Sequence, residues 1–193
     1  MPLSDRQREI IDAALELIND QGIQELTMKR IAAAVGVSEP ALYRHFPSKS
    51  EILSAVVDEM EAARSGAMSA GKTAGQSAES VLLTFFEAHA TQFQSRPELT
   101  TILFSEDVFR NDAKLLSRVV AIISGTQALL RAEIEKGKLS GFFRQDADTE
   151  NAALMLAGGF RLLVSTWRLG DYPFNLSERT ASFVKSVLAL LKK

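Results

Sequence analysis

Three closely spaced helix-start signals in residues 27–53 constrain this chain more than any other feature. Thr27, Ser38 and Ser48 each stand before an expected helix, where a hydroxyl oxygen accepts a hydrogen bond from an otherwise free backbone N–H. Gly36 permits a tight turn between the first two of these helices. Two short helices joined by a glycine-containing turn predict a helix-turn-helix, which places its second helix in the major groove of DNA.

The second helix of this pair has an unusual outward face. When Leu42 is placed inward on a helical wheel, Phe46 lies near it. Pro40, Tyr43 and Arg44 then point away from the core. Small or rigid side chains allow close approach to bases, an arginine can bind guanine or phosphate, and a tyrosine hydroxyl can bind phosphate. This face therefore favours contact with DNA over contact with water.

The charge of the segment differs from that of the whole chain. The 193 residues carry a net charge of −2, which by itself does not indicate nucleic-acid binding. Within residues 27–50, four basic side chains outnumber the single acidic one, Glu39; the four are Lys29, Arg30, Arg44 and Lys49. A local basic patch still attracts phosphate, and Lys49 at the start of a helix can join free backbone N–H groups in an anion site.

The rest of the sequence predicts an all-α fold, because apolar residues recur at helical spacing and no segment alternates with a period of two. The helix that starts after Ser48 is expected to end near Ser65, and the small, polar residues 65–80 are expected to form a loop. Further helices are expected near 79–95, 97–109, 112–136, 148–170 and 176–192. We expect about nine helices in two domains, a helix-turn-helix domain of residues 1–50 and a larger helical domain of residues 51–193.

Composition argues against several other classes of protein. The chain has no cysteine, and its two histidines, His45 and His89, are too few to predict a zinc site. No glycine-rich phosphate loop and no nucleophile–base pair is evident, so we expect no enzyme, no catalytic residue, no metal and no cofactor. The N-terminus does not look like a signal peptide, and the apolar residues 152–164 are too short for a membrane span. These features predict a cytoplasmic, nucleoid-associated protein without a membrane partner.

Residues 35–49, VGVSEPALYRHFPSK, resemble the turn, recognition helix and following helix start of the TetR family of transcriptional regulators. In that family, the positions of Thr27, Tyr43, His45 and Lys49 contact phosphate. The resemblance implies an all-α homodimer that binds a palindromic double-stranded DNA operator as a repressor and is released by a small-molecule ligand. Taken together, the candidate DNA contacts are Thr27, Lys29, Ser38, Glu39, Pro40, Ala41, Tyr43, Arg44, His45 and Lys49.

The C-terminal part of the sequence predicts an interface more clearly than a ligand. Helices near 148–170 and 176–192 carry broad apolar faces, which we expect to form the dimer interface, with an ordinary intramolecular core as the alternative. Six aromatic residues are candidates for lining a pocket for a small, largely apolar ligand: Phe85, Phe86, Phe93, Phe104, Phe109 and Trp167. Aromatic side chains at helical spacing are more often plain core, so the ligand and its contact residues stay unassigned.

Two other functions remain open at this point. Nucleoid-occlusion factors are TetR-like proteins that bind DNA and a division protein, and their recognition helix is similar to residues 35–49. Residues 96–100, RPELT, are also similar to a segment of those factors. An enzyme or an interaction scaffold in the C-terminal domain is the alternative of another class, and no motif favours it.

Overall fold

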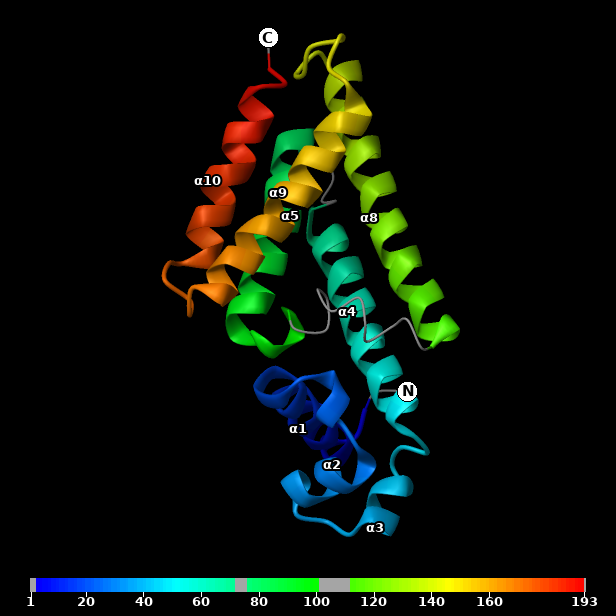
Figure 1. Ribbon diagram of the computed structural model, residues 1–193. Coiled ribbons are helices and arrows are strands. Elements are labelled where there is room, and N and C mark those ends of the chain that lie inside the picture. Colours follow the sequence, from blue (N-terminus) through cyan, green and yellow to red (C-terminus); the bar gives the residue numbers. More distant parts are fainter. Residues whose placement is uncertain (1–2, 72–75, 101–111, 193) are drawn as a thin grey trace. The chain divides into compact units, whose positions relative to one another are not determined.

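The computed structural model describes residues 3–71, 76–100 and 112–192 (Figure 1). These ranges contain helices and no β-strand, so the all-α prediction is confirmed. The helices are α1 (Asp5–Gln21), the 3-10 helix η1 (Ile23–Glu25), α2 (Met28–Val35), α3 (Glu39–Tyr43), α4 (Lys49–Gly71), α5 (Ala78–Ser95), α8 (Ala113–Leu139), α9 (Thr149–Leu169) and α10 (Leu176–Ala189).

The chain divides into two compact units that differ from a simple split along the sequence. The first unit combines residues 1–60 with 98–119, and the second combines residues 61–97 with 120–193. Helix α4 therefore begins in the first unit and ends in the second.

The helix starts of the first unit form as the sequence predicts. Ser4 and Gln7 make a capping box, in which the Gln7 N–H donates to Ser4 Oγ over 3.2 Å and the Ser4 N–H donates to Gln7 Oε1 over 3.0 Å. The Arg30 N–H donates to Thr27 Oγ1 over 3.3 Å at the start of α2. Gly36 takes the left-handed conformation that the turn requires, with φ of 73°.

The core of the first unit comes from one face of each helix. Helix α1 packs against α2, and α2 packs against α3. The apolar side chains that these helices bury are Ile10, Ile11, Ala14, Leu15, Ile18, Met28, Ile31, Ala32 and Leu42. Leu26 lies just before the Thr27 cap and is also buried, as a hydrophobic staple against α2 predicts.

Two predicted helix limits are wrong. Helix α4 runs to Gly71 instead of ending near Ser65, and Ala67 in this added stretch is buried, so packing favours the helix where local propensity does not. The prediction of a loop is therefore wrong for residues 65–71. At the other end of the predicted loop, Ser77 is the N-cap of α5. Helix α8 continues through Gly137 to Leu139. The helix expected over 97–109 lies largely outside the described residues.

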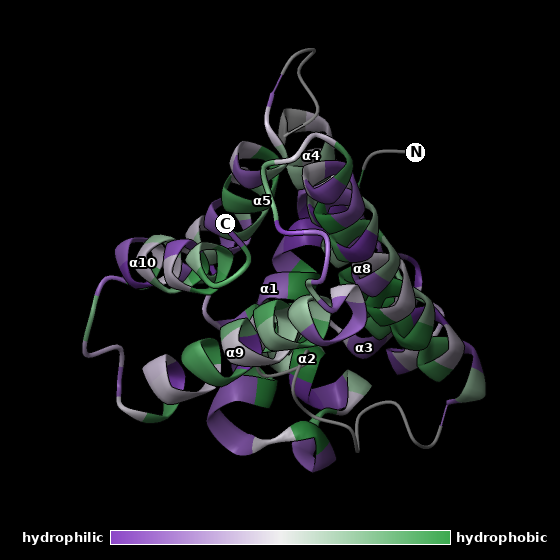
Figure 2. Ribbon diagram, turned by 90° about the horizontal axis from the view of Figure 1, so that it is seen from above, coloured by the Kyte–Doolittle hydropathy of each residue, from purple (hydrophilic) through white to green (hydrophobic). Residues whose placement is uncertain are grey.

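In the second unit, α10 packs against both α5 and α9. Gly159 of α9 lies directly under Phe183 of α10, since a Cβ at Gly159 would stand 2.2 Å from Phe183 Cζ. Val184 and Leu188 of α10 are fully buried within the chain, so part of the apolar face expected at the dimer interface belongs to the intramolecular core. Figure 2 shows hydrophobic and hydrophilic residues alternating around most of these helices, as in amphipathic helices.

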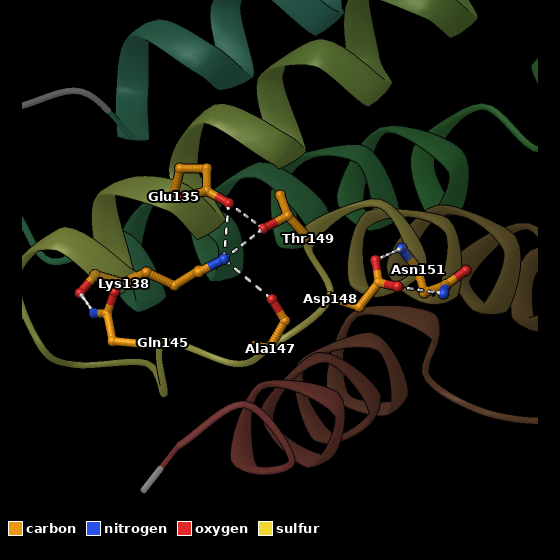
Figure 3. A network of polar contacts seen from close by, with 7 residues as sticks. All are labelled: Glu135, Lys138, Gln145, Ala147, Asp148, Thr149 and Asn151. Carbon is orange, nitrogen blue, oxygen red and sulfur yellow. Dashed lines mark hydrogen bonds and ion pairs between the residues drawn. The ribbon is translucent and has the colours of Figure 1, made fainter.

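A polar network joins the end of α8 to the start of α9 (Figure 3). Lys138 Nζ donates to Glu135 Oε1 over 3.0 Å, to the Ala147 carbonyl over 3.1 Å and to Thr149 Oγ1 over 3.2 Å. Asp148 caps α9 by accepting the Asn151 N–H over 3.0 Å. The hydrogen bond from Thr149, with Lys138 adding to it, lowers the pKa of Glu135 below its ordinary value.

Helix α8 is the one helix in the described ranges that is long and apolar enough to cross a membrane by length and composition alone. The apolar residues 152–164, by contrast, are too short for a span. Arg118 of α8 donates to the Ser54 carbonyl and hydroxyl of α4 and pairs with Asp58. These contacts are those of a helix that packs against α4 within the first unit.

Candidate DNA interface

The recognition helix α3 presents two opposite faces. Leu42 is 0% exposed and Phe46 is 5% exposed, so both anchor the helix in the core of the first unit, as the helical wheel predicts. Tyr43 is 45% exposed, and Pro40 and Arg44 are also exposed. Glu39 and Ala41 are half-buried on the flanks. The five-residue helix thus offers a proline, a phenol and a guanidinium to an outside partner.

Two exposed hydroxyls lie at the helix starts beside this face. The Thr27 and Ser38 side-chain oxygens accept backbone N–H groups, from Arg30 over 3.3 Å and from Ala41 over 3.4 Å. A capping hydroxyl uses an oxygen lone pair and keeps its own hydrogen. Both groups can therefore donate a hydrogen bond to a phosphate oxygen without giving up the cap.

Fewer basic side chains are available for phosphate than the sequence of residues 27–50 predicts. Lys29, Arg44 and Lys49 are exposed. Arg30 instead pairs with Glu25 and hydrogen-bonds Gln21 at the junction of α1 and α2. Since Glu25 lies outside residues 27–50, the sequence count missed this neutralisation, and three basic side chains remain for phosphate.

The end of α3 and the start of α4 are held from two sides. His45 is exposed, and its carbonyl accepts a hydrogen bond from Gln7 Nε2 of α1 over 3.5 Å. Ser48 accepts the Glu51 N–H over 3.2 Å, which caps the helix that begins at Lys49.

A support that sequence reasoning missed comes from a segment about sixty residues further along the chain. Ser50 donates to the Asp112 carboxylate, and Arg118 bonds Ser54 and Asp58. The Ser50 hydrogen bond, followed by the Leu115 N–H, lowers the pKa of Asp112. No local sequence signal reveals these contacts, because they join residues that only the fold brings together.

The aromatic candidates for a ligand pocket form a packed cluster in the second unit. Phe86 and Phe160 meet edge to face with ring centroids 5.2 Å apart, and Phe93 stacks on Phe160 at 6.1 Å. Phe85 meets Phe86 at 5.4 Å. Trp167 is buried and donates from Nε1 to the Phe174 carbonyl over 2.9 Å. Phe104 and Phe109 lie outside the described residues.

The described residues contain no group of three or more His, Asp or Glu side chains that could hold a metal ion. Asp148 is the N-cap of α9. Thr27, Lys29, Tyr43, Arg44 and Lys49 share the exposed surface of the first unit around the starts of α2 and α4 and the outward face of α3. This arrangement suits binding to the phosphates and base edges of a DNA groove.

Comparison with known proteins agrees with this geometry. Residues 10–56 match the family described as "Bacterial regulatory proteins, tetR family", and residues 51–192 match "YsiA-like protein, C-terminal region". The chain is 30% identical over 142 residues to the nucleoid occlusion factor SlmA of Actinobacillus pleuropneumoniae, which covers 71% of this chain and 68% of that protein.

Two solved structures share the fold over nearly the whole chain. The fatty acid degradation regulator FadR from Bacillus halodurans has a TM-score of 0.83 at 22% identity, with 100% of both chains covered. The transcriptional regulator FadR from Bacillus subtilis, solved in complex with stearoyl-CoA, has a TM-score of 0.76 at 24% identity, with 96% of this chain and 97% of that chain covered. The outward face of α3 and these matches together show that the chain belongs to the TetR family and is a DNA-binding transcriptional regulator.

Proposed function

We propose that this protein is a homodimeric repressor that leaves a palindromic operator when a long-chain acyl ligand binds its second unit. The observation that carries the proposal is that α3 has a buried face and an exposed face: Leu42 is fully buried, whereas Tyr43 and Arg44 are exposed. The proposed DNA contacts are Thr27, Lys29, Ser38, Glu39, Pro40, Ala41, Tyr43, Arg44, His45 and Lys49. Among these, the hydroxyls and lysines bind phosphate, and Arg44 reads a base.

The dimer proposal rests on apolar side chains that the single chain leaves exposed. On α9, Leu162 is 64% exposed and Leu169 is 87% exposed, and the exposed Leu154 and Met155 lie about two turns before Leu162 on a similar face. Exposed apolar residues that line one helix face mark an interaction surface. We propose that α9, with the exposed side of α10, packs against its counterpart in a second copy. The two α3 helices then reach half-sites about 34–36 Å apart.

The ligand proposal rests on the aromatic cluster of the second unit and on the comparisons. A similar fold that spans nearly the whole chain has been solved in complex with stearoyl-CoA. The cluster of Phe85, Phe86, Phe93 and Phe160 offers apolar contacts of the kind that an acyl chain needs. A ligand that binds the free protein more tightly than the DNA-bound protein shifts the equilibrium toward release.

Operator binding and release test the proposal. Genome-wide occupancy identifies the operator, and fluorescence anisotropy with that DNA measures affinity with and without palmitoyl-CoA. Light scattering after size exclusion gives the oligomeric state of Leu162→Glu, with Leu139→Glu as the matched control because Leu139 is also an exposed leucine, on α8. A monomeric wild-type protein, or DNA binding that palmitoyl-CoA leaves unchanged, would contradict the proposal.

Nucleoid occlusion is the second candidate function, and the 30% identity to SlmA favours it. The two functions predict different occupancy maps. A repressor of a few genes occupies one or a few operators beside them, whereas a nucleoid-occlusion factor occupies many sites scattered over the chromosome. In either case we propose a cytoplasmic, nucleoid-associated protein with a DNA-binding domain near residues 1–50 and a regulatory domain over residues 51–193.

A further inference from the structure

Arg64 of α4 is a half-buried cation whose guanidinium has no strong acceptor among the described residues. Its Nε atom is inaccessible to solvent and has no hydrogen-bond partner. Its Nη1 atom lies 3.5 Å from Met68 Sδ, and a thioether is only a weak acceptor. Within the described parts of the chain, no carboxylate forms an ion pair with Arg64. Because a buried N–H without an acceptor is unfavourable, a bound anion would satisfy Nε.

Helix α8 leaves room for the guanidinium at Gly125. A Cβ added to Gly125 would lie 3.4 Å from Arg64 Nη1, so the planar group rests against the backbone of that helix. A larger side chain at this position would press on Nη1. The space beside Gly125 therefore holds the guanidinium inside the second unit.

His89 of α5 lies near Arg64 and connects it with the aromatic cluster. His89 Nδ1 is 2.8 Å from the Phe85 carbonyl, so Nδ1 carries the hydrogen and donates it. Burial, partly opposed by this hydrogen bond, lowers the pKa of His89, and the positive charge of Arg64 lowers it further. The centroid of the His89 ring lies 4.4 Å from that of Phe85, with the rings tilted, and 6.5 Å from that of Phe93. Arg64 thus places a positive charge close to His89 and the aromatic cluster.

We propose that Arg64 binds the anionic group of an amphipathic acyl ligand, whose hydrocarbon chain packs on the Phe85–His89–Phe93 side of α5. This inference rests on the proposed function and assigns its ligand a charge and a binding residue. A guanidinium presents parallel N–H donors that match a carboxylate or a phosphate. The anion is either the carboxylate of a free fatty acid or a phosphate of an acyl-CoA.

Direct binding measurements test the inference. Isothermal titration compares palmitate, palmitoyl-CoA and coenzyme A alone on the wild-type protein, Arg64→Met and Arg64→Lys. The matched control is Arg131→Met, which removes an arginine of the same unit that pairs with Glu150 near the surface. We expect Arg64→Met to weaken binding of the acyl ligand about 10- to 100-fold, the loss of a charged hydrogen-bond partner. We expect Arg64→Lys to be intermediate and Arg131→Met to bind normally.

The outcomes separate this inference from the proposed function. Palmitate binding that depends on Arg64 identifies a carboxylate site, and Arg64-dependent binding of palmitoyl-CoA alone identifies a phosphate site. Wild-type affinity in Arg64→Met, with helical circular dichroism intact, would overturn the inference, and so would a wild-type protein that binds neither acyl ligand. Release from operator DNA is measured separately, so Arg64-dependent binding without release would overturn the proposed function alone.

Discussion

Leu42 and Tyr43 are neighbours in α3, yet Leu42 is 0% exposed and Tyr43 is 45% exposed. One residue anchors the helix and the next is free for a partner, because successive side chains on a helix point about 100° apart. This relationship separates the effects of mutation on folding from those on DNA binding.

Leu42→Ala is expected to destabilise the protein by about 2–5 kcal/mol, because it removes buried methyl groups and leaves a cavity. Tyr43→Ala is expected to leave the free energy of unfolding nearly unchanged, since its side chain contributes little to the core. Chemical denaturation of the two variants measures both effects. Equal destabilisation by the two substitutions would contradict the assignment of faces.

Tyr43→Ala and Lys49→Ala are expected to lower DNA affinity by similar factors on specific and non-specific sequences, because we propose that both residues contact phosphate. Lys49→Ala should also reduce the salt dependence of binding, with the slope of log K against log salt falling by about 0.9. Fluorescence anisotropy across a salt series measures both quantities. Lys185→Ala, a surface lysine of α10, is the control, and unchanged affinity in the first two variants would refute the phosphate contacts.

Arg44→Ala is expected to relax base preference as well as affinity if its guanidinium binds guanine. The cost at the operator should be about 1–3 kcal/mol and should be concentrated at one base pair of each half-site. A binding selection on randomised DNA compares the variant with the wild-type protein. A uniform loss without any change in the preferred sequence would show that Arg44 binds phosphate instead.

Gly159→Ala is expected to destabilise the second unit by about 1–3 kcal/mol, because the new Cβ would collide with the Phe183 ring. Gly66→Ala in α4 is the control: no atom lies within 4 Å of its Cβ position, and alanine favours a helix over glycine by about 1 kcal/mol. Thermal unfolding of both variants should show shifts of opposite sign. The double variant Gly159→Ala with Phe183→Leu should recover part of the loss.

The network at the α8–α9 connection predicts a loss of stability in acid. The hydrogen bond from Thr149 and the pairing with Lys138 hold the pKa of Glu135 below its ordinary value of 4.5. Such a group stabilises the fold above the pKa of the unfolded chain, and this contribution disappears as the pH falls through the folded pKa. Glu135→Gln should therefore reduce the difference in denaturant midpoint between pH 7 and pH 3. A difference as large as that of the wild-type protein would exclude a role for Glu135.

Local signals in the sequence predicted the helix-turn-helix well. Capping hydroxyls at Thr27, Ser38 and Ser48 and the left-handed turn at Gly36 act over three or four residues, so the sequence alone contains their cause. The helical wheel predicted the burial of Leu42 for the same reason. These short-range rules also carried the resemblance to the TetR family, which the comparisons confirmed.

Long-range contacts were outside the reach of such rules. Arg30 pairs with Glu25, so the basic patch has one side chain fewer than expected. Val184 and Leu188, expected at the dimer interface, are buried within the chain. Arg118 met Ser54 and Asp58 across about sixty residues. Each of these depends on which helices pack together, and a periodic pattern shows that a face is apolar without showing which partner covers it.

The sequence by itself determined that this protein is an all-α DNA-binding regulator. The helix caps, the turn and the two helix faces of residues 27–53 each depend on residues that are close together in the sequence. Only the tertiary structure decided which charges are free, which apolar faces are left uncovered, and that Arg64 lies near His89 with its Nε atom buried and without an acceptor. Those properties arise when distant helices exclude water from the groups between them, and no local pattern of residues contains that information.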